Sequence, residues 1–258
     1  MTTKTPWLAT HRARTPAARR LIAFPHAGGS ASFFRSWVPH LDDDVELGVV
    51  QYPGREGRMA EPLVPSMTEL ATAVAEAVAA DRAGRETVFF GHSMGAAVAY
   101  ETLRLLTAAG SSTVTRLCVS GRQPDGAEVV TAPRHRTDGE LLASMGALGG
   151  TRSDVLEDPD LRRMVLDIAR NDYYLIDSYR RDPDAARLDV EVVALMGEED
   201  AQTASPRMEE WSSVTTGPFS LHVFTGGHFY LAEHAESVVR LATATSVGSP
   251  GSRPVRGE

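Results

Sequence analysis

Short apolar runs rich in β-branched residues alternate along the chain with segments in which apolar residues recur every three or four positions. Each run is closed by Gly, Pro or a polar turn, and such alternation is typical of a largely parallel sheet covered by helices on both faces. The runs predict six strands: Leu21–Phe24, Val45–Gln51, Thr87–Phe90, Thr115–Ser120, Val190–Met196 and Phe219–Phe224. The pattern therefore predicts an α/β fold.

The clearest predicted helix follows the second strand. Its apolar residues repeat at helical spacing from Met67 to Val78. Ser66 and Glu69 have the spacing of a capping box at its start, and Gly84 is a stop signal at its end.

The alternation breaks between about Pro133 and Pro183, where helical patterns follow one another without a strand. Asp158-Pro159 has the residue types expected at a helix start. We expect residues 133–183 to form a helical lid inserted between core segments 20–132 and 184–242, although these helices could also simply pack on the domain. Residues 1–19 are expected to be a flexible arm and 243–258 a disordered tail. The apolar face of the lid helix comprises Leu161, Met164, Val165, Ile168, Leu175, Ile176 and Tyr179.

Composition narrows the functional classes. The chain has 258 residues, 42% of them hydrophobic, which suits one domain with a sizeable core. With 26 Lys plus Arg against 34 Asp plus Glu, the net charge of -8 argues against nucleic acid as a partner. The single cysteine, Cys118, has apolar neighbours and is expected in a buried strand. No run resembles a signal peptide or a membrane span, so we expect a cytoplasmic protein that does not bind membranes.

The segment Gly91-His92-Ser93-Met94-Gly95 lies between a predicted strand and a helical pattern. A G-x-S-x-G turn in this context lifts the serine hydroxyl above the sheet, and the glycines allow the close approach of neighbouring backbone. The helix start behind it favours developing negative charge. Ser93 is therefore the predicted nucleophile.

A serine nucleophile needs a base, and the chain contains eight histidines. His228 follows the last predicted strand, which is where the base lies in folds with this turn. His222 lies within a strand and His234 within the following helix, so both are expected to be structural. The acid that orients the base could be Asp200 or Asp125, since each follows a late strand and the order Ser, Asp, His holds for both.

An oxyanion hole needs two backbone N–H groups, and the residue after the nucleophile, Met94, supplies one. The glycine-rich loop after the first strand, residues 24–30, is placed to supply the other from Ala27. This loop lacks the lysine and the spacing of a phosphate-binding loop. No histidine spacing indicates a metal, and the expected chemistry requires no cofactor.

Four segments together resemble the stand-alone type II thioesterases of polyketide synthases and non-ribosomal peptide synthetases. In chain order they are Phe24-Pro25-His26-Ala27-Gly28-Gly29, Gln51-Tyr52-Pro53-Gly54-Arg55, the turn around Ser93, and Gly226-Gly227-His228-Phe229. The resemblance covers most of residues 20–242. It departs from the family pattern at Gln123-Pro124-Asp125, where a second basic or small residue is expected.

This resemblance implies an α/β-hydrolase fold and a Ser93–His228–Asp200 triad. It also implies hydrolysis of acyl groups from the phosphopantetheine arm of an acyl or peptidyl carrier protein, in editing or release. Two alternatives stay open: a carboxylesterase or acyl-coenzyme A thioesterase of the same fold, and a non-catalytic carrier-binding protein.

Carrier proteins of this kind are usually acidic, whereas this chain is itself net negative. Any attraction must therefore come from a local basic patch. Arg122, Arg134 and Arg136 lie on or beside the loop that leads into the predicted lid, and we expect them at the rim of the site.

Overall fold

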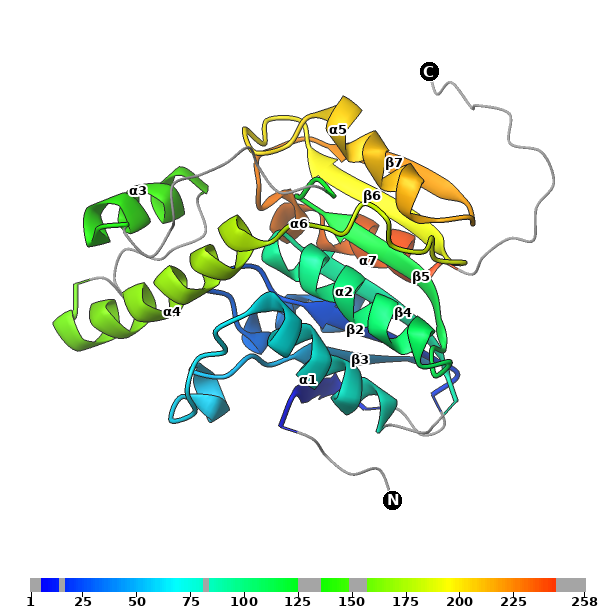
Figure 1. The fold of residues 1–258 in the computed structure, drawn as a ribbon, viewed down its shortest axis with the longest axis horizontal. Helices are drawn as coiled ribbons and strands as arrows, with labels where there is room; N and C mark the ends of the chain where they lie inside the picture. Colours follow the sequence, from blue (N-terminus) through cyan, green and yellow to red (C-terminus); the bar gives the residue numbers. More distant parts are fainter. Residues whose placement is uncertain (1–5, 14–16, 81–83, 125–135, 149–156, 245–258) are drawn as a thin grey trace.

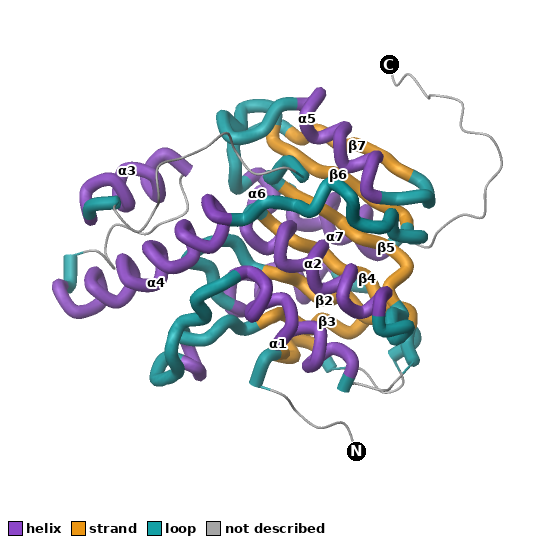
Figure 2. Tube along the Cα trace, viewed as in Figure 1, coloured by secondary structure: helices purple, strands orange, loops and turns teal. Residues whose placement is uncertain are grey.

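The computed structural model describes residues 6–13, 17–80, 84–124, 136–148 and 157–244. These residues form a seven-stranded sheet with the order β1-β3-β2-β4-β5-β6-β7, and helices lie on both of its faces (Figures 1 and 2). The strands are β1 (Leu8–Arg12), β2 (Arg19–Phe24), β3 (Val45–Val50), β4 (Glu86–His92), β5 (Val114–Ser120), β6 (Glu191–Gly197) and β7 (Phe219–Phe224). The predicted α/β-hydrolase architecture is confirmed.

Six of the seven strands are those predicted, and β2 to β7 pair in parallel. The prediction of six strands was one short, because β1 pairs antiparallel with β3 at the edge of the sheet. The expected flexible arm over 1–19 therefore does not hold for residues 8–12. The strand was missed because it is short, and it is only partly buried at the sheet edge.

Strands β2 to β6 are largely buried, and their side chains contribute to two separate cores, one on each face of the sheet. Along β2, Ile22 and Phe24 join one core, and Leu21 and Ala23 join the other. Helices α1 (Met67–Ala79) and α2 (Met94–Ala108) cover the first face. A 3-10 helix, Ala31–His40, covers the second together with α6 (Tyr230–Glu233) and α7 (Ala235–Thr243).

The predicted capping box is present at the start of α1. The Glu69 N–H donates to Ser66 Oγ at 3.2 Å, and Ser66 Oγ donates to the Glu69 carboxylate at 3.0 Å. The helix ends at Ala79, before the predicted stop at Gly84.

Two helices interrupt the alternation between β5 and β6, as the sequence predicts. They are α3 (Asp138–Leu148) and α4 (Pro159–Ser178). The Asp158 side chain caps α4 by accepting from the N–H groups of Asp160 and Leu161. Both helices lie beyond one end of the sheet, with α3 farther from it than α4 (Figure 1). Whether this segment acts as a lid stays a prediction.

Among the described residues, no helix is long and apolar enough to cross a membrane. The predicted tail, 243–258, falls outside the described residues from 245 onward. Cys118 lies in β5 with no exposed surface, as predicted, and burial raises the pKa of its thiol to about 12.

Candidate active site

Ser93 lies at a sharp turn between strand and helix. It directly follows β4 and directly precedes α2. Its φ of 55° is in the left-handed region, which a residue other than glycine rarely adopts. The Ser93 N–H donates to the Ser120 carbonyl at 2.7 Å, which holds this strained conformation in place. The predicted context of the turn is therefore present.

The glycines on either side of Ser93 make this turn possible. A Cβ on Gly91 would overlap the Gly95 carbonyl, and one on Gly95 would overlap the Phe24 carbonyl at the end of β2. Only glycine lets these segments approach so closely. The turn at Ser93 and the loop after β2 are thereby brought against each other.

His228 and Asp200 come together from the loops after β7 and β6. The Nδ1 atom of His228 lies 2.8 Å from Oδ2 of Asp200, and each residue is 4% exposed. The two loops are joined by a hydrogen bond of 3.1 Å from the Glu199 N–H to the Gly226 carbonyl. Among the described residues, His228 Nε2 has no hydrogen-bond partner. With a proton on Nδ1, this Nε2 would present a free lone pair.

Asp200 is held in its ionised form. Burial alone would raise its pKa, but the hydrogen bond and charge of His228 and the N–H of Gln202 outweigh burial and lower the pKa below its ordinary value. The rival acid, Asp125, lies outside the described residues, so the structure makes no comparison of the two.

Three imidazoles gather beside the turn, which sequence reasoning did not anticipate. The ring of His92 lies 4.8 Å from that of His228 and 5.9 Å from that of His26. His92 is fully buried, and its Nδ1 is 2.9 Å from Ser120 Oγ. Burial, and then the nearby His228 and His26, lower the pKa of His92 well below its ordinary value. His92 therefore stays neutral in the folded protein. His234, expected within a helix, lies between α6 and α7, and its Nε2 is 3.0 Å from Thr225 Oγ1.

The glycine-rich loop after β2 is held by hydrogen bonds on both sides of Ala27. The Gly28 N–H donates to Asp172 Oδ2 at 2.8 Å, and the Gly29 N–H donates to the His26 carbonyl at 2.9 Å. In the described part of the chain, the N–H groups of Ala27 and Met94 have no acceptor. Both predicted donors are thus free to bind an oxyanion.

Asp172 is a residue of this site that the sequence reasoning missed. It lies on α4, is 1% exposed, and forms a two-point ion pair with Arg55 at 2.7 and 3.0 Å. Arg55 belongs to the recognised Gln51–Arg55 segment, but its partner is 117 positions away. A buried arginine in a motif would have been the one available signal that a carboxylate lies nearby.

Two of the three arginines of the predicted basic rim lie against residues at the C-terminal end of α4. Arg122 is largely covered, and its guanidinium lies near the Tyr179 ring and the Ile176 carbonyl. Arg136 is engaged in an ion pair of 2.8 Å with Asp177. Arg134 falls outside the described residues. Arg122 and Arg136 are thus partly covered and in contact with the C-terminal end of α4. Whether they contribute to a basic rim stays a prediction.

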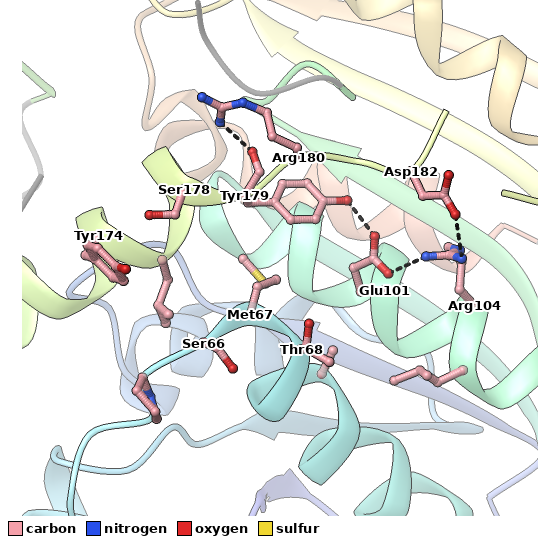
Figure 3. A pocket seen from close by; sticks show the side chains of 14 residues that line it. Ser66, Met67, Thr68, Glu101, Arg104, Tyr174, Ser178, Tyr179, Arg180 and Asp182 are labelled. Carbon is pink, nitrogen blue, oxygen red and sulfur yellow. Dashed lines mark hydrogen bonds and ion pairs between the residues drawn. The ribbon is translucent and has the colours of Figure 1, made fainter. Parts of the chain in front are cut away.

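Across the residues that the structure describes, no group of three His, Cys, Asp or Glu side chains could hold a metal ion. A cavity of about 530 Å³ lies between α1, α2 and the end of α4 (Figure 3). Tyr179 closes one side of it by donating to Glu101 at 2.7 Å. None of the predicted site residues lines this cavity.

Comparison with known proteins gives consistent matches. The Thioesterase domain family model matches residues 19–245. The chain is 41% identical to the "Probable cadicidin biosynthesis thioesterase" of Streptomyces griseus, covering 90% of this chain and 63% of that protein. It is 39% identical to "Thioesterase PikA5" of Streptomyces venezuelae, covering 87% of this chain and 80% of the relative.

Solved structures agree with these relatives. The "type II thioesterase BorB from the borrelidin biosynthetic cluster" superposes with a TM-score of 0.83 at 36% identity, covering 93% of this chain and 98% of that one. The type II thioesterase YbtT of the yersiniabactin pathway gives a TM-score of 0.82 at 29% identity, covering 91% and 96%.

Proposed function

Because this chain belongs to the Thioesterase domain family, we propose that it is a type II thioesterase that hydrolyses acyl groups from the phosphopantetheine arm of acyl or peptidyl carrier proteins. The observation that carries the proposal is the 2.8 Å contact between His228 and Asp200, beside a strained Ser93. That contact leaves Nε2 of His228 as a base.

In the proposed first half-reaction, His228 Nε2 takes the Ser93 hydroxyl proton as Oγ attacks the thioester carbonyl carbon. The carbonyl oxygen becomes an oxyanion, which the N–H groups of Ala27 and Met94 bind. The carbon–sulfur bond then breaks, and His228 gives its proton to the departing pantetheine sulfur. An acyl-serine remains.

In the second half-reaction, His228 takes a proton from water as the water oxygen attacks the acyl-serine. The new oxyanion occupies the same hole. When it collapses, the bond to Ser93 Oγ breaks, His228 returns the proton to Oγ, and the free acid leaves. Every proton in this cycle passes through His228 Nε2.

The test is Ser93→Ala, assayed with an acyl group on a carrier protein. We expect a loss on the order of 10⁴-fold or more in kcat, since losses of that size follow removal of a triad serine. Labelling by a fluorophosphonate probe should disappear as well. The control variant Ser213→Ala, at an exposed serine, should keep both its hydrolytic activity and its labelling by the probe. Turnover within tenfold of the wild type would refute the proposal.

The same assay separates the proposed substrate from its alternatives. We expect the carrier-bound acyl group to be hydrolysed with a higher kcat/KM than its coenzyme A counterpart or a simple ester. A preference for the coenzyme A thioester or the ester would instead favour an acyl-coenzyme A thioesterase or a carboxylesterase of this fold.

A further inference from the structure

The loop that carries Ala27 is fixed by a residue of α4. Asp172 Oδ2 accepts the Gly28 N–H at 2.8 Å and an Arg55 nitrogen at 2.7 Å. Arg55 in turn donates to the Gly29 carbonyl at 3.1 Å. The two residues after Ala27 are therefore both held by this ion pair.

Without Asp172, the Gly28 N–H would be a second free donor next to the Ala27 N–H. Successive N–H groups in a glycine-rich loop can turn toward one anion. Here Gly28 has a φ of +75°, and its N–H points to the carboxylate of Asp172. The Ala27 N–H is thereby left as the donor on this side of Ser93.

Stability alone is a poor explanation for this ion pair. Arg55 is 5% exposed and Asp172 1% exposed, so both charges lose almost all their water. Burying such a pair is often no more stabilising than an apolar pair of the same volume. A function in which the carboxylate orders backbone groups accounts for its position.

We propose that Asp172 is a positioning residue of the reaction: its carboxylate, together with Arg55, fixes the loop so that the Ala27 N–H meets the oxyanion. This inference rests on the proposed function, because it presupposes an oxyanion formed at Ser93. It also gives α4 a direct connection to the site, since a shift of this helix would move the acceptor of Gly28.

Two uncharged double variants separate the effect of the hydrogen-bond acceptor for the Gly28 N–H from the effect of the ion-pair charges. Arg55→Gln with Asp172→Asn removes both charges but keeps an amide oxygen for the Gly28 N–H. Arg55→Met with Asp172→Leu removes both charges and the acceptor. Neither variant leaves a buried unpaired charge, so the thermal midpoints of both can be compared directly with the wild type.

We expect the Gln/Asn double variant to keep kcat within about fivefold of the wild type. The Met/Leu double variant should lose at least about tenfold in kcat, since loss of one oxyanion donor lowers kcat by about 10² to 10³. KM should change less than about threefold in both, because the contact matters most in the transition state. Binding of an alkyl trifluoromethyl ketone, whose adduct with Ser93 carries an oxyanion, should weaken in the Met/Leu pair by the factor lost in kcat/KM.

Equal kcat values in the two pairs would overturn the inference, as would a Met/Leu pair whose ketone binding is unchanged. If the Met/Leu pair does not fold, Asp172→Ala against Asp172→Asn provides the same contrast at a lower temperature. Asp167→Asn, on the exposed side of α4, is the matched control and should behave as wild type. If Ser93→Ala keeps its activity, the proposed function itself fails; if Ser93→Ala is inactive and the two pairs are equal, only the role of Asp172 fails.

Discussion

At the scale of single residues, the orientation of His228 depends on one carboxylate. Asp200 is almost fully buried, and its two oxygens are engaged by His228 Nδ1 and the Gln202 N–H. A carboxylate held in this way fixes the tautomer of the imidazole and stabilises its protonated form during the reaction. An amide in its place offers a donor where an acceptor is needed.

Asp200→Asn should therefore lower kcat by about 10³- to 10⁴-fold with little change in folding, as in other serine hydrolases that lose this acid. The measurement is steady-state hydrolysis beside a thermal melt. Asp189→Asn, exposed in the loop before β6, is the matched control and should keep full activity. Asp125→Asn should also stay close to wild type. A larger loss in Asp125→Asn would move the acid to the earlier loop.

Gly95 offers a second test at the scale of single residues, because the site has no room for a side chain at this position. A Cβ there would overlap the Phe24 carbonyl, so Gly95→Ala must push the loop after β2 away from Ser93. We expect a loss of activity larger than the loss of stability predicts. Gly146→Ala, in α3 with open space around it, should instead leave activity unchanged. Normal activity in Gly95→Ala would show that the loop after β2 can move away without affecting the reaction.

Motif reasoning could predict Ser93 and His228 as site residues because both follow strands, where spacing along the chain determines position in space. It could not locate Asp172. That residue lies on an amphipathic helix among other acidic residues, and nothing near it in the sequence distinguishes a buried carboxylate from a solvated one. Nor could motif reasoning show that Arg122 is partly covered, because the Ile176 carbonyl that its guanidinium contacts lies 54 positions away.

At the scale of elements, α4 is held much more firmly at its C-terminal half than at its start. Asp172 binds Arg55, Asn171 donates to the Val64 carbonyl at 3.0 Å, and Tyr179, just beyond the helix, donates to Glu101. Within the described parts of the chain, the first turns of α4 show no hydrogen bond or ion pair of this kind to the rest of the domain, and Leu161 is 44% exposed. In α3 only Leu141 is buried. This segment is thus anchored at one end.

Hydrogen exchange should follow that gradient. We expect the amides of α3 and the first two turns of α4 to exchange faster than those from residue 171 onward, and β4 and β5 to exchange slowest. Mass spectrometry of peptides from these elements would resolve the order. Exchange in α3 as slow as in the central strands would contradict a segment that opens at its far end.

Hydrophobic patterns predicted the parallel strands well, because β2 to β6 each contain an apolar run that is buried in the sheet. Strand β7, at the other edge of the sheet, is only partly buried. The pattern failed for β1, in which Leu8 and Ala9 are followed by polar residues. An edge strand of five residues is stabilised by pairing with β3, and pairing is not visible in the strand's own sequence.

For the molecule as a whole, buried neutral imidazoles link folding to pH. The pKa of His92 is well below 6.5 in the folded protein, so below about pH 6.5 the unfolded chain binds a proton that the folded chain does not. The free energy of unfolding should then fall as the pH drops, by up to about 1.4 kcal/mol per pH unit for each such group. Asp200, with its lowered pKa, adds a loss only at more acidic pH.

His92→Gln should make the free energy of unfolding less dependent on pH between about 6.5 and 5. Urea unfolding at several pH values measures this slope, and His40→Gln, an exposed substitution, serves as the control. An unchanged slope in His92→Gln would mean that the folded protein protonates His92 as readily as the unfolded chain does.

The edge strand β1 also limits how far the chain can be truncated at its N-terminal side. The family match begins at residue 19, after β1, yet Leu8 and Ala9 pair with Val50 and Val49 of β3, whose residues are all buried. A chain shortened to begin at residue 19 would leave β3 paired with β2 alone, so its other edge would be open, and an open apolar edge recruits strands from other molecules. We expect such a chain to self-associate in light scattering at concentrations where the full chain does not. Strand β1 would then act as the protection of this sheet edge against aggregation.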